Sequence, residues 1–137
     1  MIIVVGGSSR KAGKTTVICD IIEATREANW TAIKITPHIH EPKDYGDTER
    51  YLAAGASRAI FIQDKQTTQI PTTGNVIIES NSILDKLTPD LFVFVDGGQD
   101  WKPSAERHAK QADYVVGGQT TPDLIARIRS ILSEQQS

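Results

Sequence analysis

The residue types best suited to chemistry lie in the first sixteen positions, which read MIIVVGGSSRKAGKTT. A short apolar run ends at Gly6-Gly7, small and polar residues follow, and Gly13-Lys14-Thr15-Thr16 opens an amphipathic segment. Strand, loop and helix in this order are typical of a loop that binds nucleotide phosphates through backbone N–H groups and a helix N-terminus. Lys14 would contact the phosphates and the Thr15 hydroxyl would bind Mg²⁺. The expected nucleotide-binding residues are Ser9, Arg10, Lys11, Ala12, Gly13, Lys14, Thr15 and Thr16.

The loop departs from the pattern G-x-x-x-x-G-K-[ST] at one position. The pattern has glycine where this chain has Ser8, and Gly7 comes one residue early. Serine enters the left-handed backbone region only at a steric cost, so we expect the loop to begin with a different shape. The alternative is a Gly/Ser-rich turn before a helix. That alternative leaves the sequence Gly13–Thr16 at the helix start unexplained, so the phosphate-binding interpretation is preferred.

A phosphate site that holds Mg²⁺ also needs carboxylates near the ends of neighbouring strands. Glu79 ends the run Asn75–Glu79, Asp96 ends the run Leu91–Asp96, and Asp47 follows the second strand. Mg²⁺ usually takes only one or two protein carboxylates, so the three cannot all be direct ligands. A solvated acid or a helix cap is the alternative for each of them. The residues alone leave Thr15, Glu79, Asp47 and Asp96 as candidate metal residues.

Basic residues gather around residues 37–50, and we expect this segment to be a mobile lid over the ligand. Its ligand-facing residues would be Lys34, His38, His40 and Arg50, with Lys43 adding charge. His38 and His40 also have the spacing of a metal chelate, but neither cysteine nor a nearby third histidine completes a zinc site. An ordinary polar surface loop is the remaining alternative.

Short apolar runs alternate with helical patterns along the chain, which predicts a P-loop NTPase-like α/β fold. Its mostly parallel sheet would be covered by helices on both faces, giving three layers. The expected strands are Ile2–Val5, Thr31–Ile35, Arg58–Ile62, Val76–Glu79, Leu91–Val95 and Tyr114–Val116. The expected helices are Thr15–Ala28, Thr48–Ala54 (capped by Asp47), Asn81–Leu87, Pro103–Gln111 and Pro122–Ser133, the last opened by Thr121. The polar link Gln63–Asn75 has no helical period, so either its strands are antiparallel or the crossover helix is lost.

Composition narrows the class of protein further. The chain has 137 residues, which fits a single domain over residues 1–137. Its 17 acidic and 15 basic residues are nearly balanced, so no field favours nucleic acid or an anionic membrane. The N-terminal apolar run is too short for a signal peptide and nothing else could span a bilayer. We therefore expect a cytoplasmic protein.

Taken together, these motifs resemble one known family. The segments Gly13–Thr16, Ala32–Ile35 with His38 and His40, Asp47–Arg50 and Ala53–Ala56 resemble the molybdopterin-guanine dinucleotide biosynthesis adaptor (MobB) family. The likeness covers about the first eighty residues in order. The family's "V-E-G" strand would correspond to Val76–Glu79, which favours Glu79 over Asp96 as the acid near Mg²⁺. Ser80 stands where the family has glycine.

The resemblance implies a GTP-binding adaptor with at most slow hydrolysis, often a homodimer, that assists a molybdenum-cofactor protein partner. No N-K-x-D box is present, so GTP is implied by the resemblance alone. Two other functions stay open. One is an ATP-dependent small-molecule kinase or ligase resembling dethiobiotin synthetase, which shares a P-loop, a lysine after the second strand and a strand-end acid. The other is a degenerate P-loop scaffold without nucleotide turnover.

Overall fold

A computed structural model describes residues 1–9, 12–36, 45–63, 70–98, 101 and 103–136. Within them, six strands form one sheet in the order β3-β2-β4-β1-β5-β6, and all five neighbouring pairs are parallel. The strands are β1 (Ile2–Gly7), β2 (Thr31–Thr36), β3 (Arg58–Gln63), β4 (Val76–Glu79), β5 (Leu91–Val95) and β6 (Tyr114–Val116). The helices are α1 (Lys14–Ala24), α2 (Tyr45–Ala54), α3 (Pro103–Gln111) and α4 (Pro122–Gln136), with short 3₁₀ turns η1 (Arg26–Ala28) and η4 (Ser82–Asp85).

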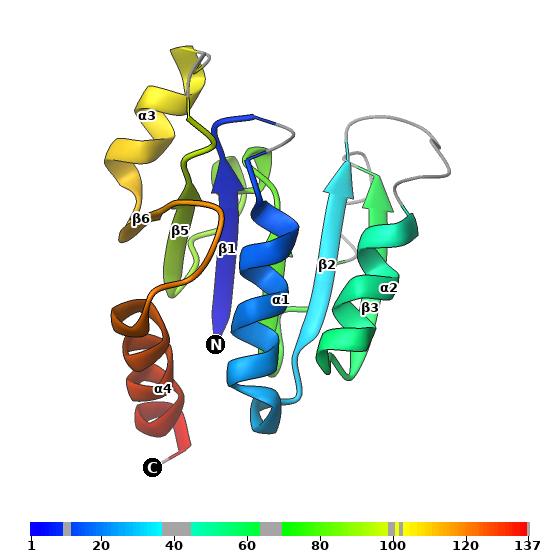
Figure 1. Cartoon of the computed structure of the whole chain (residues 1–137). Coiled ribbons are helices and arrows are strands. Elements are labelled where there is room, and N and C mark those ends of the chain that lie inside the picture. Colours follow the sequence, from blue (N-terminus) through cyan, green and yellow to red (C-terminus); the bar gives the residue numbers. More distant parts are fainter. Residues whose placement is uncertain (10–11, 37–44, 64–69, 99–100, 102, 137) are drawn as a thin grey trace.

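The sheet is the middle of three layers, as the alternating pattern predicts (Figure 1). Side chains of α1, α2 and α4 share one apolar core with one face of the sheet. Side chains of α3 and η4 share a second core with the other face. The predicted α/β class is therefore confirmed, with a wholly parallel sheet.

The winding of the chain changes direction at β1. From β1 the chain passes to β2 and β3 on one side; after β4 it continues to β5 and β6 on the other side (Figure 1). Loops that leave neighbouring strands in opposite directions open a crevice at the carboxyl ends, which is where open α/β sheets bind ligands. The loop between β1 and α1, with the ends of β4 and β5 beside it, lies at this point.

Strand alternation assigns the two strand-end acids to opposite faces of the sheet. Side chains two residues apart on a strand point the same way. Ile77 belongs to the core under α1 and α2, so Glu79 points toward those helices. Phe94 belongs to the core under α3, so Asp96 points toward the other layer.

The structure corrects two expectations about the elements and excludes one of the two alternatives for the link after β3. The second helix begins at Tyr45 rather than Thr48, so Asp47 lies inside its first turn and does not cap it. The segment 81–87 forms only the short turn η4. The antiparallel alternative for the link between β3 and β4 fails because β4 pairs in parallel with β1 and β2. Residues 70–75 of that link contain no helix, and 64–69 lie outside the described residues.

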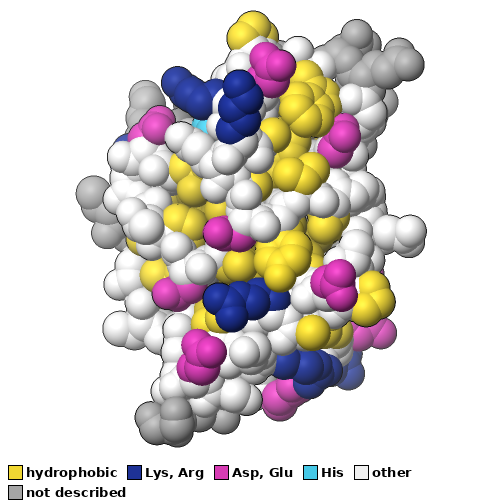
Figure 2. All heavy atoms as spheres, turned by 90° about the vertical axis from the view of Figure 1, so that its left-hand side faces the viewer, with side chains coloured by type: hydrophobic (Ala, Val, Ile, Leu, Met, Phe, Trp, Pro, Cys, Tyr) yellow, Lys and Arg dark blue, Asp and Glu magenta, His cyan; other side chains and the backbone are white. Residues whose placement is uncertain are grey.

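The last helix begins as predicted, since the N–H of Leu124 donates to the Thr121 hydroxyl at 3.3 Å. Among the described residues no helix is long and apolar enough to cross a membrane. Figure 2 shows the side of the molecule on which β6 lies, where apolar side chains gather between scattered charges. Val115 on this edge strand is 52% exposed.

Candidate phosphate and metal site

Ser8, the departure from the loop pattern, ties the loop to the turn after β5. Its N–H donates to the carbonyl of Val95 at 3.0 Å, and its hydroxyl accepts from the N–H of Gly97 at 2.8 Å. The residue is only 3% exposed. A buried hydroxyl needs such a partner, because an unsatisfied polar group in the interior is costly. The serine therefore has a structural role that glycine could not fill.

Glycines are required where the loop meets its neighbours. Gly13 precedes α1 with a φ of 101°, in the left-handed region that favours glycine. A Cβ atom there would also lie 2.9 Å from the Cα of Gly118, which follows β6. A Cβ on Gly97 would lie 2.8 Å from the Cα of the buried Ala12. The loop is thus packed against the segments after β5 and β6.

Lys14 begins α1 and extends back along the loop. A Cβ on Gly7 would lie 2.9 Å from both Cγ and Cδ of Lys14, so the lysine stem passes directly over Gly7. Of the other predicted phosphate contacts, Ser9 is exposed and accepts from the N–H of Ala12 at 3.3 Å. Arg10 and Lys11 lie outside the described residues.

Asn81, which sequence reasoning missed, holds the other side of Gly7. Its Oδ1 accepts from the N–H of Gly7 at 3.1 Å, and its Nδ2 donates to the carbonyl of Gly7 at 3.0 Å. The strand pairing of β1 with β4 ends at Val5 and Glu79, so this side chain continues the pairing where the β4 backbone leaves. The available signal was an asparagine two residues after the end of a strand.

Glu79 is the centre of a buried cluster. Its side chain is 4% exposed, and its Oε1 accepts from the Thr15 hydroxyl at 3.0 Å and from the Tyr51 hydroxyl. Its Oε2 accepts from Nζ of Lys34 at 2.8 Å. Lys34 and Glu79 are direct register partners on β2 and β4, so their side chains leave the sheet together. Lys34, predicted as a ligand-facing residue of the lid, lies on β2 and belongs to this cluster.

Helix α2 supplies the rest of the cluster. Asp47 and Tyr51 are four residues apart and share one helix face. Asp47 Oδ2 lies 2.5 Å from Nζ of Lys34, and Tyr51 is fully buried. The missed Tyr51 looked like an ordinary core residue of an amphipathic helix. Only the fold shows that its hydroxyl reaches Glu79.

The charges in this cluster support each other. Burial opposes the positive charge of Lys34, but Glu79 and Asp47 outweigh burial and raise the pKa of the lysine above its ordinary value. Burial, followed by the charge of Glu79, raises the pKa of Tyr51. At neutral pH the lysine is therefore charged and the phenol is protonated, and both donate to the carboxylate.

Arg50 lies beside the start of α1. Its Nη2 donates to the Thr16 hydroxyl at 3.2 Å, which brings its guanidinium next to the candidate loop. His38, His40 and Lys43, the other basic residues of the predicted lid, lie outside the described residues.

Asp96 takes part in a separate, local arrangement. Its Oδ1 accepts from the N–H of Gly98 at 2.8 Å and from Nε1 of Trp101 at 3.0 Å. Trp101 in turn contacts Phe94 edge to face, with ring centroids 5.3 Å apart. This arrangement lies on the α3 side of the sheet, away from Thr15.

The residues on the α1 side fit the chemistry of Mg²⁺. One cluster joins the Thr15 hydroxyl with the carboxylates of Glu79 and Asp47, and Mg²⁺ prefers oxygen ligands, of which one or two are protein carboxylates. Within the part of the chain that the structure describes, no three His, Cys, Asp or Glu side chains form a metal-binding group. Phosphate oxygens and water would have to complete the coordination.

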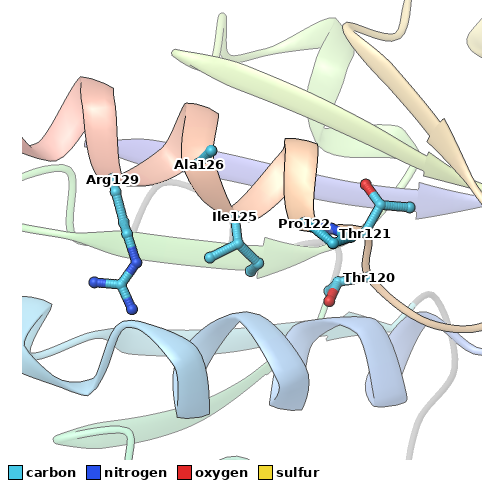
Figure 3. Close-up of a pocket in the computed structure, with 6 residues that line it drawn as sticks. All are labelled: Thr120, Thr121, Pro122, Ile125, Ala126 and Arg129. Carbon is cyan, nitrogen blue, oxygen red and sulfur yellow. The ribbon is translucent and has the colours of Figure 1, made fainter.

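A separate groove lies along the first part of α4, and none of the candidate phosphate or metal residues lines it. Ile125 and Arg129 point from α4 toward α1 (Figure 3), and Nη1 of Arg129 lies 3.1 Å from the Glu27 carboxylate. The lining residues are Thr120, Thr121, Pro122, Ile125, Ala126 and Arg129.

Comparisons of the chain with protein families, curated proteins and solved structures gave no match.

Proposed function

We propose that this protein binds a nucleoside triphosphate together with Mg²⁺ through residues 9–16 and acts as a cytoplasmic adaptor with at most slow hydrolysis. One observation carries the proposal. The Thr15 hydroxyl at the start of α1 donates to Glu79, a buried carboxylate at the end of the strand beside β1. A hydroxyl and a carboxylate in this relation, next to a lysine that runs back along the loop, suit a metal-bound polyphosphate.

Each residue has a distinct part in the proposed site. The loop amides and Lys14 would bind the phosphates, assisted by the N-terminus of α1. The Thr15 hydroxyl donates a hydrogen bond to Glu79, which leaves the lone pairs of its oxygen available for Mg²⁺. Bound Mg²⁺ would neutralise phosphate charge. Glu79 and Asp47 would hold it directly or through water, and Arg50 beside Thr16 would add a second positive group.

The choice of GTP, the homodimer and the molybdenum-cofactor partner come from the resemblance to the MobB family. The proposal includes them on that ground. Neither a nucleic acid nor a membrane enters it, because the nearly balanced charge offers no broad basic surface.

Nucleotide-dependent thermal unfolding tests the proposed function. Ligands that bind only the folded state raise the melting temperature. We expect a rise with GTP and Mg²⁺, a smaller one with ATP and Mg²⁺, and none with guanosine. A rise with ATP together with a phosphorylated product would instead support the kinase or ligase. If no nucleotide raises the melting temperature, the result would support the degenerate P-loop scaffold.

A further inference from the structure

The ammonium group of Lys34 lies between the two carboxylates of the candidate metal site. Its Nζ is 2.5 Å from Asp47 Oδ2 and 2.8 Å from Glu79 Oε2. All three side chains are shielded from water, with exposures of 17% for the lysine, 22% for Asp47 and 4% for Glu79. The protein thus places a positive charge of its own where these carboxylates would hold a cation.

The partners of Glu79 differ in how easily they can leave. Oε1 accepts from two neutral hydroxyls, Thr15 on α1 and the buried Tyr51 on α2. Oε2 accepts from Lys34, whose ammonium is carried on a flexible four-carbon stem. A divalent cation on Oε2, or on Asp47, would come within a few ångströms of this ammonium, and like charges at such distances repel strongly. The lysine is therefore the partner that a metal ion must displace.

We propose that Lys34 is a built-in competitor of the divalent cation. In the ligand-free protein it neutralises Asp47 and Glu79, and it leaves them when the metal enters with an anionic ligand that can accept the released ammonium. This inference rests on the proposed function, because the triphosphate is that ligand. It adds that the metal alone binds weakly and that metal and triphosphate strengthen each other's binding. A purely structural lysine would give neither effect.

Titration of the nucleotide-free protein with Mn²⁺, followed by electron paramagnetic resonance, tests the inference. The variants are Lys34→Met, which removes the charge; Lys34→Arg, which keeps it; and Lys110→Met, which removes an exposed lysine on α3. We expect Lys34→Met to bind Mn²⁺ at least about tenfold more tightly than the wild type, a change typical of removing a neighbouring like charge. Lys34→Arg and Lys110→Met should stay near the wild type. Unchanged or weaker Mn²⁺ binding by folded Lys34→Met would overturn the inference.

The wild-type protein provides a second measurement that does not depend on the variant folding. Lysine acetylation is mapped by mass spectrometry as Mn²⁺ is added. Labelling of Lys34 should rise over the concentrations at which Mn²⁺ binds, while labelling of Lys110 stays constant. Constant labelling of Lys34 during binding, or no Mn²⁺ binding at millimolar concentrations, would contradict the inference.

The two proposals can fail separately. Thermal unfolding with GTP and Mg²⁺ tests the nucleotide, whereas the Mn²⁺ titration uses the metal alone. If GTP binds, Lys34→Met should also reduce the factor by which GTP tightens Mn²⁺ binding. If GTP binds and that factor is unchanged, the competitor role is wrong while the nucleotide site stands.

Discussion

Two acidic residues end the strands on either side of β1, yet their surroundings have little in common. Glu79 at the end of β4 is buried and receives hydrogen bonds from α1, α2 and β2. Asp96 after β5 receives them from Gly98 and Trp101, both within five residues along the chain. One acid joins distant segments and the other closes a turn. Strand alternation explains the difference, because Glu79 faces the layer that contains Thr15 and Asp96 faces the opposite layer.

This contrast gives the two acids different expected functions. Glu79, whose carboxylate accepts from the Thr15 hydroxyl, is in direct contact with the candidate phosphate site. A carboxylate that binds Trp101 stabilises the turn into α3. Substitutions on the two sides of β1 should therefore separate ligand binding from stability.

The largest expected effect comes from Lys14, which lies over Gly7 at the start of α1. Lys14→Ala should weaken triphosphate binding by about 2–4 kcal/mol, since the phosphate would lose a charged partner. Isothermal titration calorimetry with GTP and Mg²⁺ measures this, and Lys110→Ala is the matched control. Unchanged affinity in a folded Lys14→Ala protein would remove the basis for the phosphate-binding loop.

Glu79→Gln and Asp96→Asn, which remove one charge each, test which of the two strand-end acids supports the metal. Glu79→Gln should raise the Mg²⁺ concentration needed to hold the nucleotide by about 10–100-fold, the usual cost of losing a supporting metal-site residue. Asp96→Asn should leave it within about twofold of the wild type, because it does not contact Thr15. If only Asp96→Asn raises it, the wrong side of β1 has been assigned to the metal.

Removing a single hydroxyl should have a smaller effect, which is on stability. Tyr51→Phe leaves Oε1 of the buried Glu79 with one donor fewer, which should lower the free energy of unfolding by about 1–3 kcal/mol. Tyr114→Phe, on the partly buried edge strand β6, is the control and should change it by less than about 0.5 kcal/mol. Urea unfolding measures both. Equal losses would mean that the Tyr51 hydroxyl contributes no more than an edge position.

Much of this arrangement could be predicted from the sequence, and the missing parts have definite causes. Three strands were predicted with their observed bounds, because apolar runs such as Val76–Glu79 end in clear polar breaks. Glu79 was favoured through a family resemblance, whereas the structure supplies the reason in its contact with Thr15. Tyr51 and Asn81 were missed because local patterns do not show which distant backbone or side chain a polar group will meet. For the same reason, local patterns do not show that Lys34 contacts both Asp47 and Glu79.

The smallest effect is expected on the α3 side, at His108. This residue is 9% exposed, and burial together with the nearby Arg107 lowers its pKa, against a smaller opposing effect of Asp85. The unfolded chain binds a proton at His108 with a pKa of about 6.5, while the folded protein binds it only at lower pH. Between those two values the unfolded state holds more protons, so stability should fall as the pH drops. His108→Gln should flatten this part of the curve.

The Lys34 cluster should titrate in a different range. The pKa of Lys34 is raised in the folded protein. The stability that its charge contributes is therefore complete below the ordinary lysine value of about 10.4 and is lost only as the pH rises through the folded value. Urea unfolding of the wild type, His108→Gln and Lys34→Arg across pH 5–8 separates the two sides. We expect Lys34→Arg, which keeps a positive charge beside Glu79 and Asp47, to leave the slope of the curve unchanged, whereas His108→Gln changes the slope at the acid end. If the Lys34 variant changes the slope and His108→Gln does not, the group that titrates near neutral pH lies on the α1 side and not on the α3 side.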